Sequence, residues 1–325
     1  MEPILKIENL TTCFKSEMGG YLKAVNKISF ELEEGDILGI VGESGSGKSV
    51  TALSIMGLLP SKNSKITEGT ILYKDTDLLK LNKKQLRKIR GKEISMIFQE
   101  PMTSLNPVFT IGNQIGEVFR NHTNLGKEEI KRKSIELLKK VEIPRAEQIL
   151  KEYPHQLSGG MKQRIMIAMA IALGPTILIA DEPTTALDVT IQAQILELIE
   201  KLAKEIKMSV IFITHDLGVV AETCNKVIVM YSGQFIEKAT IKDLFSKPKH
   251  QYTESLLGCL PEVNKDIGEL RNIEGTVPHP GDEIQGCRFE PRCIASLKKC
   301  KVKEPPFFNF KNDHQSKCWL NEEKL

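Results

Sequence analysis

One loop of the sequence reads Gly42-Glu43-Ser44-Gly45-Ser46-Gly47-Lys48-Ser49, which has the form G-x-x-x-x-G-K-S/T. The apolar residues 37–41 before it predict a strand, and residues 48–58 after it predict a helix. Glycines at these positions let backbone N–H groups wrap around phosphates, and the helix N-terminus adds a partial positive charge. A chance match in a glycine-rich loop would lack this strand and helix, so the loop predicts a nucleotide-phosphate site.

Individual residues of this loop are expected to have separate roles. Lys48 is expected to reach the β- and γ-phosphates, and the Ser49 hydroxyl is expected to hold Mg²⁺. Val50 has no hydroxyl, so only its backbone N–H can serve the phosphates. The loop residues expected to bind the nucleotide are Gly42, Ser44, Gly45, Ser46, Gly47, Lys48, Ser49 and Val50.

Two carboxylates end the apolar run Ile177-Leu178-Ile179-Ala180-Asp181-Glu182. A buried strand would place Asp181 at its C-terminal edge, beside the glycine-rich loop, where α/β sheets bind ligands. Asp181 would then order the Mg²⁺ shell, and Glu182 would polarise the attacking water. An acidic pair after a strand is by itself more typical of a helix start. Its combination with the phosphate loop favours the catalytic interpretation.

The composition is that of an ordinary globular chain of 325 residues, with 41% hydrophobic and 27% charged residues. The formal net charge of +3 gives no strong basic field, so nucleic acid is not expected as a partner. The longest apolar run, residues 165–180, is interrupted by Gly174-Pro175 and is shorter than the ~20 residues of a membrane span. The N-terminus does not resemble a signal peptide. These features predict a chain located in the cytoplasm.

Hydrophobic periodicity predicts strands that alternate with helices. A hairpin is expected over residues 227–238, with its turn at Ser232-Gly233. Residues 107–173 are mostly helical by their period, whereas residues beyond Leu260 are rich in Pro, Cys and charge. The alternation predicts an α/β fold around a largely parallel sheet that is covered on both faces. Further strands are expected at residues 4–7, 28–32, 37–41, 94–98, 176–180 and 209–213, and a further helix at residues 188–206.

A predicted helix is preceded by the stretch Leu157-Ser158-Gly159-Gly160-Met161-Lys162-Gln163. Ser-Gly-Gly could simply be a helix cap with a flexible approach. The stretch also resembles the signature Leu-Ser-Gly-Gly-x-x-Gln of the ATP-binding cassette (ABC) family, which closes over the γ-phosphate bound by the other protomer. Backbone N–H groups and a helix N-terminus again face an anion. The resemblance implies that the trans-acting residues are Ser158, Gly159, Gly160, Gln163 and Asp188.

Other motifs of the family follow in the expected order over residues 1–260. Gln99, after a strand, resembles the glutamine that touches Mg²⁺ and the transport subunit. His215 resembles the switch histidine that contacts the γ-phosphate, and residues 185–188 resemble the loop that couples the two sites of a dimer. The resemblance implies that the catalytic residues are Glu182, His215, Lys48 and Gln99, and that the Mg²⁺ ligands are Ser49, Gln99 and Asp181.

The adenine contact is predicted at Phe14, which falls where the family stacks an aromatic residue on the base. Val25 is expected to lie beneath that ring. Phe14 could equally be a core residue of a strand, and Tyr21 is a rival for the same role.

The resemblance implies an α/β P-loop NTPase fold, the ABC nucleotide-binding domain, with a mixed sheet, a β subdomain and a helical subdomain at about residues 105–173. The ABC ATPase domain is expected over residues 1–260. Residues 261–325 are expected to form a small Cys-rich C-terminal domain that holds a metal cluster. The expected ligands are ATP and Mg²⁺, and the expected reaction is ATP hydrolysis that requires a second nucleotide-binding protomer.

Several stretches resemble one branch of the family, the ATPases of dipeptide and oligopeptide permeases. Relatives of this branch handle nickel or glutathione, so these substrates are alternatives. A non-transport ABC ATPase is an alternative of another class, but such members usually carry long coiled-coil insertions or two cassettes, and neither is found in this sequence. A generic P-loop switch protein is a further alternative, against which the stretch Leu157-Ser158-Gly159-Gly160 argues. The matching stretches are residues 40–49, 98–107, 181–190 and 250–257, the last of which departs at Gln251, where the branch usually has Pro.

The same resemblance implies partners and a location. The expected partners are a second ABC ATPase subunit (a homologous chain or a second copy), two transmembrane permease subunits and, indirectly, an extracytoplasmic peptide-binding protein. The chain is then expected to lie as a peripheral subunit on the cytoplasmic face of the cell membrane, where the helical insertion after Gln99 receives a short helix from the permease.

Four of the seven cysteines follow one another as Cys287-x₅-Cys293-x₆-Cys300-x₁₇-Cys318. Spacing alone does not choose between zinc, iron–sulfur and unrelated cysteines, because the close pairs of zinc sites and the tight ferredoxin run are both missing. Residues 287–293 read Cys-Arg-Phe-Glu-Pro-Arg-Cys and resemble a motif of longer members of the branch, whose tails are similar to ones that hold a 4Fe-4S cluster. The resemblance implies a 4Fe-4S cluster, with Zn²⁺ as the alternative, on the ligands Cys287, Cys293, Cys300 and Cys318.

Overall fold

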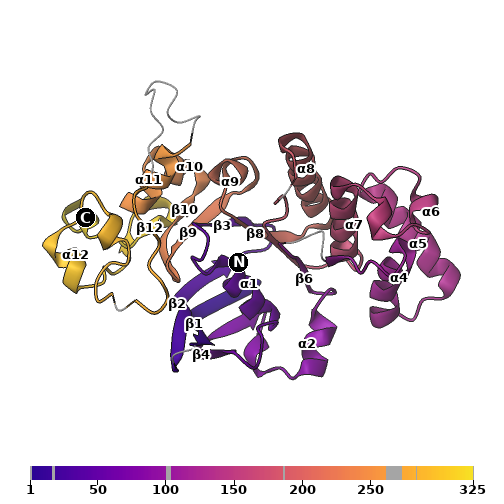
Figure 1. Cartoon of the computed structure of the whole chain (residues 1–325), viewed down its shortest axis with the longest axis horizontal. Helices are drawn as coiled ribbons and strands as arrows, with labels where there is room; N and C mark the ends of the chain where they lie inside the picture. Colours follow the sequence, from indigo (N-terminus) through magenta and orange to yellow (C-terminus); the bar gives the residue numbers. More distant parts are fainter. Residues whose placement is uncertain are drawn as a thin grey trace. The chain divides into compact units, whose positions relative to one another are not determined.

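The computed structural model describes residues 2–16, 19–99, 104–185, 187–260, 273–282 and 284–324. The chain folds as two compact units. The first unit contains residues 1–79 and 212–325, and the second contains residues 80–211. Figure 1 shows the helices and strands, most of them with labels. Within the described residues, no helix is both long and apolar enough to cross a membrane.

An antiparallel sheet of the first unit is built around β1, which pairs with β2 on one side and with β4 on the other. The strands predicted at residues 4–7 and 28–32 are confirmed, although both are longer. β4 was not predicted, because its first seven residues are exposed or half-buried and carry no apolar alternation. The strand order is β2-β1-β4-β5, with bounds β1 Leu5–Lys15, β2 Tyr21–Leu32, β4 Ser64–Tyr73 and β5 Thr76–Asp77.

A second sheet of the first unit is mixed, as predicted. β3 pairs with β9 in parallel, and β9 pairs with β10 antiparallel. The turn at Ser232-Gly233 joins β9 to β10, which confirms the predicted hairpin. From β3 the order runs through β9, β10 and β12 to β11, with bounds β3 Ile37–Val41, β9 Lys226–Tyr231, β10 Gln234–Thr240, β12 Gln315–Ser316 and β11 Phe308–Asn309.

The helices of the first unit are short. The predicted helix after the phosphate loop is confirmed as α1 (Lys48–Met56), which is bounded by Gly47 and Gly57, both in the left-handed region. The other helices are α9 Leu217–Thr223, α10 Ile241–Ser246, α11 Gln251–Gly258 and α12 Lys298–Val302, with 3₁₀ turns at Leu78–Lys80, Glu290–Arg292, Lys311–Asp313 and Trp319–Lys324.

The second unit combines parallel strands with a group of helices. β6 pairs in parallel with β7, and the backbone N–H of Ser209 donates to the Thr176 carbonyl oxygen where β8 begins. Helices α4, α5 and α6 lie together beside α7 in Figure 1. The bounds are β6 Ile94–Ile97, β7 Ile177–Asp181, β8 Ser209–Thr214, α2 Lys83–Ile89, α4 Ile111–His122, α5 Lys127–Lys140, α6 Ala146–Ile149, α7 Gly159–Ile171, 3₁₀ Pro154–Gln156 and α8 Val189–Ile206.

The C-terminal segment packs into the core of the first unit. β12 pairs with β10, and the Phe289 ring lies 5.3 Å from the rings of both Tyr231 and Tyr252. A smaller apolar cluster contains Cys300, Phe308 and Trp319. The domain boundary predicted after residue 260 falls on residues 261–272, which lie outside the described residues, so a separate C-terminal domain stays a prediction.

Candidate functional site

The loop from Gly42 to Ser49 joins the buried strand β3 to α1, and two of its glycines lie against neighbouring backbone. Gly42 has φ +156°, and a Cβ built on it would lie 2.1 Å from the Met230 carbonyl oxygen. Gly47 has φ +103°, and its Cβ would lie 2.6 Å from the Ala24 carbonyl oxygen. Residues with side chains would clash at both positions, so the glycines allow the loop to lie tightly on β9 and β2.

The polar groups of this loop face inward. Lys48 is only 5% exposed, and its Nζ donates to the carbonyl oxygens of Gly42 at 2.7 Å and Glu43 at 3.0 Å. Ser49 follows Lys48 in the first turn of α1. The buried Oγ of Ser46 has no hydrogen-bond partner among the described residues. A phosphate bound at this loop could accept hydrogen bonds from the Ser46 hydroxyl, from the Lys48 ammonium and from the N–H groups at the N-terminus of α1.

The predicted adenine contacts lie on the antiparallel sheet of the same unit. Phe14 is half-buried near the end of β1, opposite Leu22. Val25 is fully buried, and a Cβ on Gly47 would lie 3.5 Å from its Cγ2, so Val25 lies directly beside the phosphate loop. The rival Tyr21 is 48% exposed, and Lys65 Nζ lies 3.6 Å from the centre of its ring. Because this cation occupies one face of Tyr21, Phe14 is the better stacking candidate.

His215 is exposed and follows directly after β8. The next residue, Asp216, caps α9 by accepting from the backbone N–H of Gly218 at 2.8 Å. The strand before His215 and the capped helix after it therefore fix the backbone that carries the imidazole.

The acidic pair lies at the C-terminal end of β7 in the second unit, as predicted. Asp181 is the last residue of β7 and is 3% exposed. Glu182 has φ +45°, an unusual backbone conformation for a residue with a side chain. Its Oε2 accepts from Gln99 Nε2 at 3.0 Å and from Thr185 Oγ1 at 2.9 Å. These two donors fix the direction of the Glu182 carboxylate.

The signature stretch begins α7 in the same unit. Ser158 is the N-cap, and its Oγ accepts from the backbone N–H of Met161 at 3.3 Å. A Cβ on Gly160 would lie 3.0 Å from Ile191 Cγ2, which shows that α7 meets α8 closely at this point. The buried Gln163 donates through Nε2 to the Pro183 carbonyl oxygen at 2.5 Å, which joins the signature helix to the segment after the acidic pair.

The start of α8 is fixed by Asp188, whose Oδ1 accepts from the backbone N–H of Ile191 at 3.0 Å. Ala186 of the predicted coupling loop lies outside the described residues. The predicted site residues thus form two sets, each ordered by contacts within its own unit. The first unit carries the phosphate loop, Phe14, Val25 and His215, and the second carries Gln99, Asp181, Glu182, the signature residues and Asp188.

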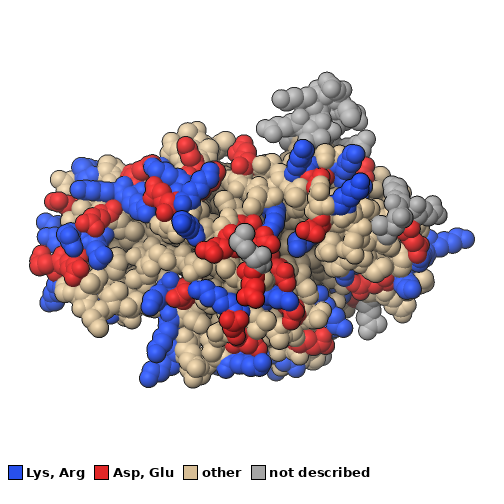
Figure 2. Space-filling model, turned by 180° about the vertical axis from the view of Figure 1, so that it is seen from behind, with Lys and Arg blue, Asp and Glu red and all other residues tan. Residues whose placement is uncertain are grey.

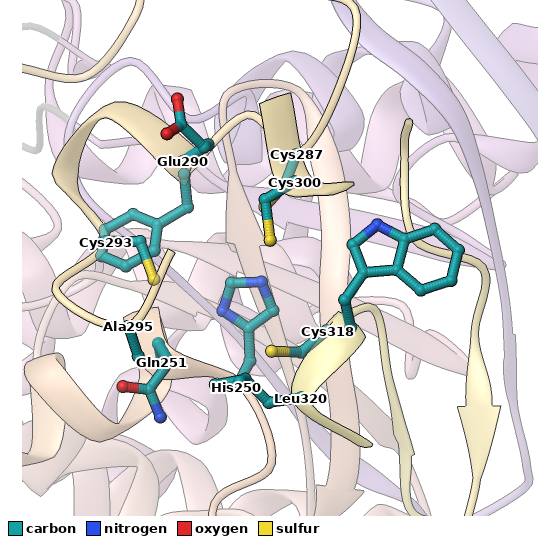
Figure 3. A pocket seen from close by; sticks show the side chains of 11 residues that line it. His250, Gln251, Cys287, Glu290, Cys293, Ala295, Cys300, Cys318 and Leu320 are labelled. Carbon is teal, nitrogen blue, oxygen red and sulfur yellow. The ribbon is translucent and has the colours of Figure 1, made fainter. Parts of the chain in front are cut away.

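The four predicted cluster cysteines line one pocket of the first unit, together with His250, Phe289 and Trp319. Figure 3 shows the sulfur atoms of Cys293 and Cys318 pointing toward the space beside the His250 ring. Burial raises the pKa of Cys287 to about 12 and also raises the pKa of Cys293 and Cys318. Among the described residues, no group of three or more His, Cys, Asp or Glu side chains is arranged so that it could hold a metal ion.

His250 was not predicted as a pocket residue, although it lies in one of the stretches that resemble the peptide-import branch. Its Nδ1 accepts from the backbone N–H of Tyr252 at 3.0 Å, so the imidazole caps α11. Burial lowers the pKa of His250 to about 3, against a hydrogen bond to the Lys317 backbone that acts in the opposite direction. The imidazole is therefore neutral and has a structural contact within the pocket wall.

Contacts to the phosphate loop from the C-terminal segment were also missed. Arg292 Nη1 donates to both carboxylate oxygens of Glu43 at 3.1 Å, and Arg288 Nη1 donates to Ser232 Oγ at 3.1 Å. Both arginines lie inside the Cys-Arg-Phe-Glu-Pro-Arg-Cys stretch, but nothing in their sequence spacing indicates a loop 249 residues away.

Charges of both signs are interspersed on the face that Figure 2 shows. The whole chain has 45 Lys and Arg residues against 42 Asp and Glu residues. This mixture agrees with the predicted lack of a strong basic field.

Comparisons with protein families match two regions of the chain. Residues 25–185 match the family described as ABC transporter, which covers the phosphate loop, the signature stretch and the acidic pair. Residues 236–300 match the family described as oligopeptide/dipeptide transporter, C-terminal region, which includes Cys287, Cys293 and Cys300.

Curated relatives match over the whole chain. The oligopeptide transport ATP-binding protein AppD of Bacillus subtilis (strain 168) is 51% identical over 100% of this chain and 98% of its own length. The dipeptide transport ATP-binding protein DppD of the same strain is 48% identical over 100% of this chain and 96% of its own length.

Solved structures agree with the fold. The ATP-binding cassette MJ0796 in a dimeric post-hydrolysis state, bound to ADP and Pi, is 31% identical with a TM-score of 0.64, over 73% of this chain and 98% of that chain. A structure of cbiO1 from Clostridium perfringens, part of the ABC transporter complex cbiONQ, is 28% identical with a TM-score of 0.64, over 76% of this chain and 92% of that chain. The motifs, their geometry and these full-length matches together place the chain in the ATP-binding subunits of the oligopeptide/dipeptide branch of the ABC transporter family.

Proposed function

We propose that this chain hydrolyses ATP and thereby drives the import of oligopeptides or dipeptides through a separate membrane permease. The observation that carries the proposal is the match to AppD and DppD over the entire chain, which includes the C-terminal region typical of these transporters. Nickel or glutathione is the alternative cargo, because the cargo does not contact this subunit in the proposed arrangement.

The hydrolytic step is assigned to the residues of both units. Lys48 and the N–H groups of its loop bind the β- and γ-phosphates, and Glu182 accepts a proton from the attacking water. The Gln99 and Thr185 side chains hold the Glu182 carboxylate in one direction. His215 contacts the γ-phosphate. Phe14 stacks on adenine, with Val25 supporting the loop.

Oxygen donors suited to Mg²⁺ occur in both units: the Ser49 hydroxyl, the Asp181 carboxylate and the Gln99 amide oxygen. Their hard-donor chemistry fits this ion, so these three residues are its proposed ligands. When bound, Mg²⁺ would neutralise part of the phosphate charge that develops in phosphoryl transfer.

A second nucleotide-binding protomer is proposed to complete each site. The support is the helix N-terminus capped by Ser158, which presents N–H groups suited to an anion. Gly159 and Gly160 continue this surface, whereas the buried Gln163 is proposed to order it through its hydrogen bond to the Pro183 carbonyl oxygen. Asp188 is proposed to act from the coupling loop. The related cassette MJ0796 is dimeric with ADP and Pi. The partner is either a homologous ATPase or a second copy of this chain.

Permease docking is assigned to a pocket of the second unit. It is lined by Arg90, Phe98, Leu105, Met166 and further residues of α4 and α7. Phe98 is 41% exposed, although it is aromatic and adjoins Gln99. A pocket beside Gln99 that is lined by both apolar and charged side chains suits a short amphipathic helix of the permease. Binding there would hold the chain as a peripheral subunit at the cytoplasmic face of the membrane. An extracytoplasmic binding protein would deliver the peptide to the permease on the opposite side.

The cysteine pocket is proposed to hold a 4Fe-4S cluster, with Zn²⁺ as the alternative. The support is the donor chemistry alone: four thiols line one pocket, and soft thiolates are the usual ligands of both groups. Among the described residues no three of these side chains are arranged to hold a metal ion, so the cysteines would have to move closer together to bind one. A bound cluster would cross-link the C-terminal segment and so stabilise a part of the chain that has a small apolar cluster of its own. Protein purified without oxygen should be brown and contain iron and sulfide. Colourless protein that contains stoichiometric zinc would instead show that the pocket binds Zn²⁺ and no cluster.

Transport can be tested with uptake of a labelled dipeptide by cells that lack this subunit. Wild-type chain should restore uptake, whereas Glu182→Gln should not, because ATP would bind without being hydrolysed. Lys301→Ala, at an exposed position, serves as the matched control and should restore uptake. Normal dipeptide uptake in every strain, with a defect in nickel or glutathione uptake, would overturn the assignment of peptides as the cargo. The proposal that ATP hydrolysis by this chain drives transport would stand.

A further inference from the structure

An acidic residue occupies the phosphate loop. Glu43 is the second residue of the loop, and the anionic phosphates are expected to bind only a few residues away. A carboxylate at this position opposes an anion unless a cation neutralises it. The backbone N–H of Glu43 donates to the Tyr252 hydroxyl at 2.9 Å, which fixes the main chain but leaves the carboxylate charge unbalanced.

Arg292 supplies the neutralising cation. Its Nη1 lies 3.1 Å from each carboxylate oxygen of Glu43 and 3.3 Å from the Tyr231 hydroxyl. The Arg292 side chain is 5% exposed, whereas the Glu43 side chain is 29% exposed. The Arg292 guanidinium is therefore shielded from solvent, whereas the Glu43 carboxylate is partly exposed. A charge-assisted contact of this kind is stronger than an exposed ion pair.

The guanidinium is itself anchored. Nε donates to the Glu274 carbonyl oxygen at 2.9 Å, and Nη2 donates to the Ile273 carbonyl oxygen at 3.3 Å. Burial acts to lower the pKa of Arg292, but its hydrogen bonds to Tyr231 and Glu43 raise the pKa overall. All three guanidinium nitrogens therefore have partners, and the group cannot turn away from Glu43 without losing them.

A second arginine of the same segment reaches the loop by another route. Arg288 donates to Ser232 Oγ, and the N–H of the following Gly233 donates to the Ser46 carbonyl oxygen at 2.9 Å. Phe289, between the two arginines, is 2% exposed and packs on Tyr231 and Tyr252. The segment from Cys287 to Cys293 thus reaches the phosphate loop at two points, directly at Glu43 and at Ser46 through the turn at Ser232-Gly233.

We propose that Arg292 is a positioning residue of the nucleotide site, which neutralises Glu43 and holds the phosphate loop in the shape that receives ATP. The proposal rests on the proposed function in that the loop binds ATP. It also makes the Cys287–Cys293 segment a support of the ATP site, so the C-terminal segment and the nucleotide site are energetically coupled.

Nucleotide binding by the full chain tests the proposal without requiring hydrolysis. The probe is a fluorescent ATP analogue with Mg²⁺, and Kd is measured for wild type, Arg292→Ala, Arg292→Lys and the control Lys131→Ala, at an exposed position of α5. Arg292→Ala should raise Kd about fivefold to tenfold, because the unpaired Glu43 then repels the phosphates. Arg292→Lys keeps the charge and should recover part of the loss. The KM for ATP should follow Kd, with a smaller change in kcat.

The decisive variant is the double substitution Glu43→Gln with Arg292→Ala. Removing the carboxylate removes the need for its partner, so Kd should return to within about twofold of wild type. A merely structural role of Arg292 would leave the double variant as weak as Arg292→Ala. Far-ultraviolet circular dichroism identifies variants that fail to fold, and in that event Arg292→Lys and Glu43→Gln carry the comparison.

Two results separate failure of this proposal from failure of the proposed function. A folded Arg292→Ala chain that binds the analogue as tightly as wild type would overturn the positioning role. A wild-type chain that binds no analogue would instead overturn ATP binding, whatever Arg292 does.

Discussion

Gln99 and Glu182 are joined by a 3.0 Å hydrogen bond from the amide Nε2 to the carboxylate Oε2, across 83 residues of sequence. The same carboxylate oxygen accepts from Thr185 Oγ1, so the proposed base has two donors on one atom. Under the proposed function, this hydrogen bond would link the Glu182 carboxylate to the pocket beside Phe98 that is assigned to the permease.

The carboxylate of Glu182 should be required for hydrolysis but not for binding. Glu182→Gln keeps the size of the side chain and removes its basicity, so kcat should fall by roughly 10²–10⁴-fold. The Kd for ATP should stay near that of wild type, and ATP-bound dimers should accumulate in gel filtration. Unchanged hydrolysis would refute the role of Glu182 as the base.

Loss of the Gln99 donor should weaken catalysis less than loss of the base. Gln99→Ala leaves the Glu182 carboxylate with Thr185 as its other described donor, so kcat should fall roughly tenfold through poorer orientation. Thr185→Val, which removes the other donor, should have a similar effect, and the double variant should be worse than either. Steady-state phosphate release measures all three, and full activity in Gln99→Ala would contradict the orienting contact.

The contact between α7 and α8 leaves no space for a side chain at Gly160. Gly160→Val should destabilise the chain by about 1–3 kcal/mol, because a Cβ would already lie 3.0 Å from Ile191 Cγ2. Urea unfolding measures the change. Adding Ile191→Ala should recover part of the loss. Gly159→Ala is the control, because its Cβ would lie at an ordinary 3.6 Å from Leu187.

A buried carboxylate ties the C-terminal segment to β10. Glu237 is 0% exposed and accepts from the backbone N–H groups of Lys249 at 2.6 Å and His250 at 3.0 Å, with His314 Nε2 2.7 Å away. Glu237→Ala would leave these buried groups without their acceptor and should cost about 3 kcal/mol of unfolding free energy. Glu33→Ala, at an exposed ion pair with Lys226, should cost less than about 1 kcal/mol. Equal losses would contradict the assigned role of Glu237.

The free energy of unfolding should decrease at alkaline pH because of the buried thiol of Cys224. Burial raises the pKa of Cys224 to about 12, although a hydrogen bond with Thr223 acts to lower it. The unfolded chain releases the Cys224 proton near pH 9, whereas the folded chain releases it only near pH 12. The free energy of unfolding therefore keeps its full value below pH 9 and decreases between pH 9 and pH 12. The slope is at most about 1.4 kcal/mol per pH unit. Cys224→Ala should show a shallower fall in urea unfolding, and identical slopes would exclude the thiol as the cause.

Motifs and periodicity determined those features that depend on residues close together in the chain. The phosphate loop, the acidic pair and the capped signature helix each lie within about ten residues, so their local conformations follow from glycine positions, apolar runs and capping residues. The strand before the loop, the helix after it and the hairpin at Ser232-Gly233 were predictable for the same reason. β4 was not, because its polar half carries no periodic signal and pairs with β1 through backbone hydrogen bonds.

Only the tertiary structure decided which distant residues meet. The Arg292–Glu43 pair joins positions 249 residues apart, and no sequence motif that contains one of these residues predicts contact with the other. The pairing of β12 with β10, and the enclosure of His250 with the cysteines, likewise depend on packing around the Tyr231, Tyr252 and Phe289 rings. Local sequence sets backbone conformation over a few residues, whereas burial of apolar surface selects long-range partners, so the sequence alone predicted the ATP-binding motifs but not their support by the C-terminal segment.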